Sequence, residues 1–207
     1  MALVKHNNNS ISAVTSMASL TTGSMTLIKE VTASSDASIS FVDGSSDVVL
    51  DSTYPIYKFE FTNIHPATDS VYFLMNFSTD GGSNYNVTKT TTAFIGFHRE
   101  DDSTAVLQYQ TGDDLAQSTS FQRMTVLIGN GNDESSSGSI YLFNPSSTTF
   151  VKHFISETND YERNNASSNT RVAGYANTTS AVDAVQFKMS SGNIDAGTIK
   201  LYGIKDS

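Results

Sequence analysis

Short stretches of alternating apolar and polar residues follow one another along the chain after residue 24. In residues 56–64, Tyr57, Phe59 and Phe61 fall on one side of an extended backbone and the intervening residues on the other. A period of two over so few residues indicates half-buried β-strands, and no stretch of about 10–15 residues has helical spacing. We expect strands at residues 25–31, 38–42, 56–64, 71–78, 91–99, 104–110, 121–129, 139–144, 149–156 and 171–177.

Two more strands are predicted close to the C-terminus, at residues 185–189 and 199–204, on either side of a Gly-containing turn. Val185, Phe187 and Met189 share one face of the first of these strands. Two arrangements fit this pattern. The strands form a β-hairpin, or they are two strands of a sandwich.

The turn signals have the spacing of an all-β domain. Asp43-Gly44 and Asp80-Gly81-Gly82 are typical turn sequences, and the polar residues 157–170 are expected to form the longest loop. About ten to twelve short strands predict an all-β fold, a jelly-roll-like antiparallel β-sandwich whose strand order stays open. We expect one sandwich domain at residues 25–207 and an extended, polar N-terminal arm at residues 1–24.

Composition excludes several classes of protein. The net charge of -9 argues against a nucleic-acid partner, because phosphate binding needs clustered Lys and Arg. The chain has no Cys, which excludes disulfides and thiolate metal ligands, and no Trp. No segment approaches the about 20 apolar residues of a membrane-spanning helix, and the first residues lack the apolar centre of a secretory signal. We therefore expect no membrane insertion.

No set of residues predicts an enzyme. The histidines have no zinc-site spacing, and the acidic pairs in the predicted loops lack the alternating pattern of a calcium loop. There is no nucleophile-elbow motif and no Gly-rich phosphate loop. We expect no catalytic residue, metal or cofactor.

Recognition by exposed aromatic side chains is the remaining kind of site. Loops on a rigid sandwich commonly carry binding residues, and we expect loops at residues 80–86, 111–119 and 157–170. Within them, Tyr85 and Tyr161 lie in polar surroundings and are the candidate recognition residues, for instance for a glycan on a host surface.

Three segments resemble a known family. Residues 27–69 (LIKEVTASSDASISFVDG and onward), 129–156 (GNGNDESSSGSIYLFNPSSTTFVKHFIS) and 172–205 (VAGYANTTSAVDAVQFKMSSGNIDAGTIKLYGIK) resemble small β-sandwich virion proteins of tailed bacteriophages, many of them marine. The similarity covers most of residues 25–205 and contains no catalytic motif. It implies a structural protein of a phage particle, of the capsid-decoration, fibre or tail-associated kind.

Two functions follow from this resemblance. The first is a decoration or cement protein on the capsid surface, attached through the arm, for which Leu3, Val4, Ile11 and Val14 are the candidate attachment residues. The alternative is a receptor-binding or carbohydrate-binding module on a head or tail fibre. Both imply a homo-oligomer, such as a trimer, and contacts with other virion proteins. Both also imply a location in the virion, and in the host cytoplasm during assembly.

Overall fold

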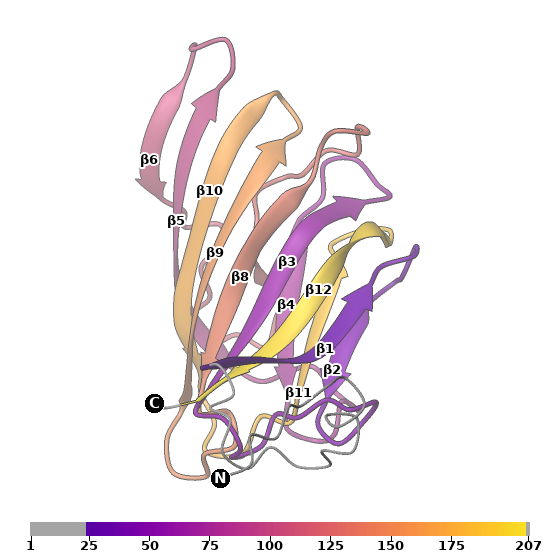
Figure 1. The fold of residues 1–207 in the computed structure, drawn as a ribbon. Coiled ribbons are helices and arrows are strands. Elements are labelled where there is room, and N and C mark those ends of the chain that lie inside the picture. Colours follow the sequence, from indigo (N-terminus) through magenta and orange to yellow (C-terminus); the bar gives the residue numbers. More distant parts are fainter. Residues whose placement is uncertain (1–23, 206–207) are drawn as a thin grey trace, which may run out of the picture.

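The computed structural model describes residues 24–205, and in this range it contains twelve β-strands and no helix (Figure 1). The predicted all-β antiparallel sandwich of about ten to twelve strands is therefore confirmed. Residues 24–205 also contain no helix that is long and apolar enough to cross a membrane. The candidate attachment residues of the arm lie outside the described residues.

The strands pair into two antiparallel sheets of unequal size. The large sheet has eight strands in the order β1-β12-β3-β8-β9-β10-β5-β6, and the small sheet has four in the order β2-β11-β4-β7. In Figure 1 the large sheet stands in front of the small one. The strand bounds are β1 Met25–Thr32, β2 Ile39–Val42, β3 Ile56–Pro66, β4 Phe73–Ser78, β5 Lys89–Arg99, β6 Ala105–Tyr109, β7 Gln122–Arg123, β8 Ser136–Phe143, β9 Lys152–Glu162, β10 Ala166–Ala176, β11 Ala184–Met189 and β12 Ile194–Ile204.

The alternation read from the sequence places the core between the two sheets. Tyr57, Phe59 and Phe61 of β3 point inward from the large sheet and are buried. Phe187 of β11 lies opposite them in the small sheet and meets a ring of aromatic side chains. The centroid of its ring is 5.1–6.3 Å from those of Phe41, Phe59, Phe61 and Phe73.

The last two strands belong to different sheets. β11 pairs with β2 and β4 in the small sheet, whereas β12 pairs with β1 and β3 in the large sheet. The sandwich arrangement is thus confirmed, and a terminal hairpin is wrong. β12 also begins earlier than expected, at Ile194, because a β-bulge around Gly197 (φ +113°) lets the chain pair with β3 inside the predicted turn.

The expected loop at residues 157–170 is wrong. β9 runs on to Glu162 and β10 starts at Ala166, so that only a three-residue turn remains. The side chains alternate between buried and exposed, and the buried positions include Thr158 and Asp160. A strand whose inward side chains are polar carries no hydrophobic alternation, which is the signal on which the prediction depended.

The expected strand at residues 121–129 is also wrong. Only Gln122–Arg123 pairs with β4 as a strand, and the chain then follows β4 irregularly. The reason lies in polar contacts across the sandwich. Thr158 Oγ1 donates to the main-chain oxygen of Met124 at 2.7 Å, and the main-chain N–H of Val126 donates to Asp160 Oδ2 at 3.3 Å. These bonds draw the segment towards β9 and interrupt its pairing with β4.

Candidate interaction surface

The outer face of the large sheet is organised in rows, because residues directly opposite one another in antiparallel strands share a face. One row starts at the β1 edge, where Met25 pairs with Ile204, Ile204 with Ile56, and Ile56 with Phe143. Phe143 and His153 each lie one residue beyond the Leu142–Phe154 pair of β8 and β9. The row therefore continues from Phe143 to His153 and on through β10 and β5. The complete first row is Met25, Ile204, Ile56, Phe143, His153, Tyr175 and Thr90.

A second row lies two residues further along each strand. Its members are Leu27, Tyr202, Lys58, Tyr141, Ile155, Ala173 and Thr92. Lys58 is the one member that carries a full charge, and its ammonium group lies 2.7 Å from Glu60, outside the row. The two rows together are therefore almost uncharged.

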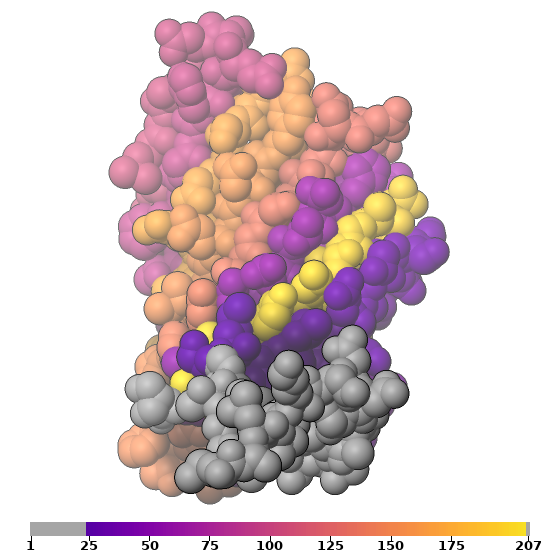
Figure 2. Space-filling view, viewed as in Figure 1, coloured from indigo at the N-terminus to yellow at the C-terminus, as the bar shows by residue number. Residues whose placement is uncertain are grey.

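We call these two rows the apolar band. It crosses seven of the eight strands, from β1 to β5, at the end of the sheet where β1 begins and β12 ends. Met25, Leu27 and Ile155 keep 46%, 49% and 52% of their surface exposed. Figure 2 views this face, with the strands of the large sheet lying next to one another as coloured stripes. Contiguous exposed apolar surface of this kind is characteristic of interaction sites.

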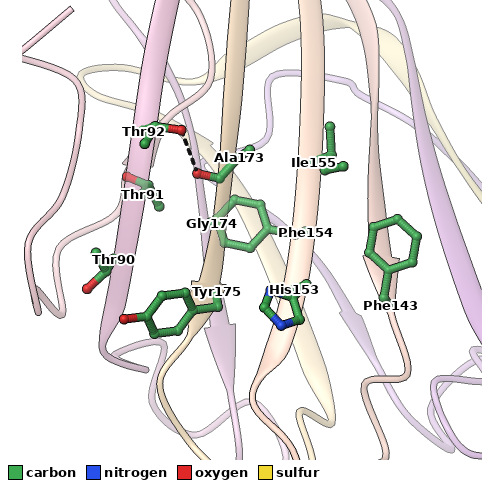
Figure 3. Close-up of a pocket in the computed structure, with 10 residues that line it drawn as sticks. All are labelled: Thr90, Thr91, Thr92, Phe143, His153, Phe154, Ile155, Ala173, Gly174 and Tyr175. Atoms are coloured by element: carbon green, nitrogen blue, oxygen red, sulfur yellow. Dashed lines mark hydrogen bonds between the residues drawn. The ribbon is translucent and has the colours of Figure 1, made fainter.

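The band contains a shallow hollow of about 500 Å³ over β8, β9, β10 and β5. Tyr175 and His153 project from neighbouring strands, with ring centroids 6.1 Å apart, and Phe143 lies on the other side of His153 (Figure 3). Thr90 and Ile155 are also among the lining residues. The hollow offers aromatic and aliphatic contact with few hydrogen-bonding groups, which suits an apolar side chain.

The next row of the outer face, beside the second row, carries charged side chains. Arg171 donates to both carboxylate oxygens of Glu157 at 2.9 and 3.0 Å, and these hydrogen bonds lower the pKa of Glu157. Lys200 lies 3.6 Å from Glu30 in the same row. Because these charges pair with one another along the sheet, they form a polar border to the band.

The two tyrosines predicted for recognition lie in different settings. Tyr161 is half-buried on β9, not in a loop, and it lines a second hollow of about 320 Å³ with polar neighbours that include Arg99, Asn159 and Ser167. Tyr85 is half-buried in the connection from β4 to β5. Its main-chain oxygen accepts a hydrogen bond from Asn76 Nδ2 at 2.6 Å, so its backbone has a structural contact. The structure places no Tyr85 atom in the Tyr161 hollow.

Two of the histidines form isolated pairs with acidic groups. His65 lies 3.6 Å from Asp195, and His98 lies 3.0 Å from Asp102 on an exposed turn. Among residues 24–205, no three His, Asp or Glu side chains gather closely enough to hold a metal ion.

Lys89 and Asp160 are titratable groups buried inside the sandwich, away from the band. Lys89 Nζ donates to Asn76 Oδ1 at 2.5 Å and to the main-chain oxygen of Val87 at 2.8 Å, and burial lowers its pKa to about 7. Asp160 accepts a hydrogen bond from Ser136 Oγ, and burial raises its pKa to about 7. Each group is hydrogen-bonded to a neighbouring strand. Neither lines the hollow in the band, and Asp160 is among the residues that line the hollow around Tyr161.

The sequence contained part of the signal for the band. Four apolar residues occupy positions where the alternation predicts an outward side chain: Ile56, Phe143, Ile155 and Ile204. Taken singly, each is an ordinary exposed hydrophobic residue. Only the register of the strands shows that they lie in two adjacent rows.

No protein-family model, no curated protein and no solved structure matches this chain. The function therefore has to be inferred from the chemistry of the surface and from the sequence segments quoted above.

Proposed function

We propose that this protein is a non-enzymatic structural subunit of a tailed-phage particle, a decoration protein that binds a neighbouring virion protein through the apolar band. The observation that carries the proposal is the band itself, two adjacent rows of mainly apolar side chains across seven strands, with Met25, Leu27 and Ile155 about half exposed. A rigid sheet that presents such a surface is suited to a broad, flat contact.

The chemistry of the band favours a protein partner. Interface centres are enriched in aromatic residues and depleted of charge, and they are surrounded by a polar rim. The band supplies Tyr141, Phe143 and Tyr175 as aromatic anchors, and the Glu157–Arg171 pair belongs to the rim. A sugar would need more hydrogen-bonding groups than the hollow offers.

We place the band on a phage particle because residues 27–69, 129–156 and 172–205 resemble phage virion proteins. The location in the virion and the passage through the host cytoplasm during assembly are part of this proposal. Self-association, for instance as a trimer, stays a prediction alongside it.

A charge placed in the band should abolish attachment. We expect Ile155→Lys to weaken binding to particles that lack the protein by at least tenfold, because burying an unpaired ammonium group costs more than the about 1.4 kcal/mol that corresponds to a factor of ten. The measurement adds purified protein to such particles and quantifies the bound fraction after sedimentation. Ile155 is 52% exposed on the sheet surface, so the free protein should fold normally.

Leu107→Lys is the matched control. Leu107 lies on β6, outside the band, is 84% exposed, and its replacement changes the net charge by the same amount. This variant should bind particles like the unmodified protein. Full binding by Ile155→Lys would show that the band is not the attachment surface.

Glycan recognition is a second candidate function, and the hollow around Tyr161 favours it. This hollow combines an aromatic ring with the side chains of Arg99, Asn159 and Ser167. A ring that stacks on a sugar, together with donors and acceptors for its hydroxyl groups, is the usual composition of a glycan site.

Tyr161→Ala separates the two functions. If the hollow recognises a host glycan, we expect this variant to reduce adsorption of particles to host cells severalfold and to leave its incorporation into particles unchanged. Tyr85→Ala is the paired variant, because Tyr85 was predicted on the same grounds but lines no part of this hollow. Equal adsorption by both variants and the unmodified protein removes the glycan function from Tyr161.

A further inference from the structure

We propose that the side chains of Lys89 and Asn76 condense with each other inside the folded protein, forming an isopeptide (amide) bond and releasing ammonia. Lys89 is the first residue of β5 in the large sheet, and Asn76 belongs to β4 in the small sheet. The product is therefore a covalent bridge between the two sheets. This inference concerns the interior of the sandwich and depends neither on the apolar band nor on a phage particle.

The two reacting groups are in contact. Lys89 Nζ lies 2.5 Å from Asn76 Oδ1. Because a C=O bond is about 1.23 Å long, the distance from Nζ to the amide carbon, Asn76 Cγ, is at most about 3.7 Å. Reacting atoms in a near-attack arrangement are about 3–3.5 Å apart, and well-oriented groups of one molecule react as if their concentration were about 10⁵–10⁸ M. The contact thus supplies the proximity that an amine and an amide free in solution lack.

The amine of Lys89 has the protonation state that the attack requires. An ordinary lysine is protonated at neutral pH and has no lone pair to donate. Burial lowers the pKa of Lys89 to about 7, and no charged group contributes to this shift. A neutral amine has two N–H groups, and both have an acceptor here, Asn76 Oδ1 and the main-chain oxygen of Val87 at 2.8 Å. The neutral form therefore fits its surroundings, and rotation about the Cε–Nζ bond turns the lone pair towards Cγ.

The amide of Asn76 is held in one orientation. Its Nδ2 donates to the main-chain oxygens of Tyr85 at 2.6 Å and Thr119 at 3.0 Å. The N–H of Phe77 donates to Oδ1 at 2.9 Å. These bonds place Oδ1 on the side of Lys89, and the Phe77 N–H stabilises the negative charge that develops on Oδ1 when Cγ is attacked.

The reaction needs no further reactant. Lys89 Nζ forms a bond to Asn76 Cγ, and the bond between Cγ and Nδ2 breaks. One proton passes from Nζ to Nδ2 within the tetrahedral intermediate, and Nδ2 leaves as ammonia. Both side chains are fully buried, which excludes the water that would compete for Cγ.

Mass spectrometry of the full chain tests the proposal. Incubation of the folded protein at pH 9, where the amine is neutral, should produce a growing fraction of chains that are lighter by one ammonia, about 17 Da. Trypsin cuts after Lys and Arg but not after a lysine in amide linkage. Residues 59–99 should then appear as one bridged peptide in place of residues 59–89 and 90–99. The rate should fall about tenfold for each pH unit below 7, because the amine becomes protonated.

Two controls require no substitution. Lys152 is also buried, and burial lowers its pKa, but its Nζ donates only to the main-chain oxygens of Phe150 and Thr178. Since it has no side-chain amide within reach, cleavage after Lys152 should stay complete. The same chain kept unfolded in guanidinium chloride at pH 9 loses the contact between Lys89 and Asn76, and it should form no bridge.

Complete cleavage after Lys89 in the incubated, folded protein would overturn the proposal. This holds even if the mass falls by one ammonia, because ring closure at Asn130-Gly131 releases ammonia without blocking Lys89. In bridged chains the Lys89 nitrogen is an amide that no longer titrates, so any pH dependence of stability caused by this amine belongs to the unreacted chains. Particle binding by Ile155→Lys is independent of the bridge, so the two proposals fail separately.

Discussion

Phe187→Ala should lower the free energy of unfolding by about 3–5 kcal/mol, the range for removing a fully buried Phe side chain. Phe187 lies at the centre of the aromatic cluster between the sheets. Its ring stacks on Phe73 at 5.7 Å and meets Phe59 and Phe61 edge-on at 5.3 and 5.1 Å. The substitution removes these contacts together, and rigid strands on both sides prevent the cavity from closing.

Urea denaturation of the two proteins measures this difference, provided that the slope of the transition is unchanged. Phe150→Ala is the control, because Phe150 is the same residue type at 69% exposure, and its removal should alter stability by less than about 0.5 kcal/mol. A loss below about 1 kcal/mol for Phe187→Ala would contradict the central position of Phe187 in the core.

The protein should become more stable as the pH rises from about 7 towards 10. Burial lowers the pKa of Lys89 from its ordinary value of 10.5 to about 7 in the folded protein. Between these values the unfolded chain holds more protons than the folded one, and stability therefore increases with pH. Each pKa unit corresponds to about 1.4 kcal/mol, so the rise should amount to a few kcal/mol.

Asp160 acts in the opposite direction at lower pH. Burial raises its pKa from 3.8 to about 7, so the folded protein holds more protons between these values and loses stability as the pH rises through this window. The two groups together predict a stability minimum near neutral pH. Above pH 10 stability should no longer rise. Burial raises the pKa of Tyr57 above its ordinary value of 10.0, so ionisation of Tyr57 then favours the unfolded chain.

Two single variants test which buried group causes the change in stability on each side of the minimum near neutral pH. Lys89→Met should remove most of the rise in unfolding free energy above pH 7, and burial of Lys152, which also lowers the pKa of that amine, accounts for the remainder. Asp160→Asn should abolish the fall between pH 4 and 7. Denaturation midpoints measured at intervals of one pH unit provide both slopes. Identical pH profiles for Lys89→Met and the unmodified protein would exclude the buried amine as the source of the rise.

The outer face of the large sheet thus divides along its strands into an apolar band, a charged row and a polar end. The polar end includes Asn159, whose amide donates to Ser167 Oγ at 3.1 Å on the neighbouring strand. This gradient separates a surface for protein contact from the hollow around Tyr161. Both proposed functions can therefore be tested on one protein without interfering with each other.

Strands with apolar inward residues could be predicted from the sequence. β3 and β11 have regular alternation, and their inward residues Tyr57, Phe59 and Phe187 are buried as expected. The turns at Asp43-Gly44 and Asp80–Gly82 are also where they were predicted, and their glycines have the positive φ angles that such turns require. Local chemistry suffices for these elements, because burial and backbone conformation depend on each residue and its neighbours.

The sequence by itself therefore determined the all-β class, the aromatic core and most strand positions. Tertiary structure decided the rest. The second half of β9 is a strand because it pairs with β10 on one side and β8 on the other. Its inward residues Thr158 and Asp160 are polar and bond to residues 124–126, so they leave no hydrophobic period to detect in the sequence. The apolar band likewise exists only through register: shifting any strand by one residue would turn its outward side chains into the core and break both rows.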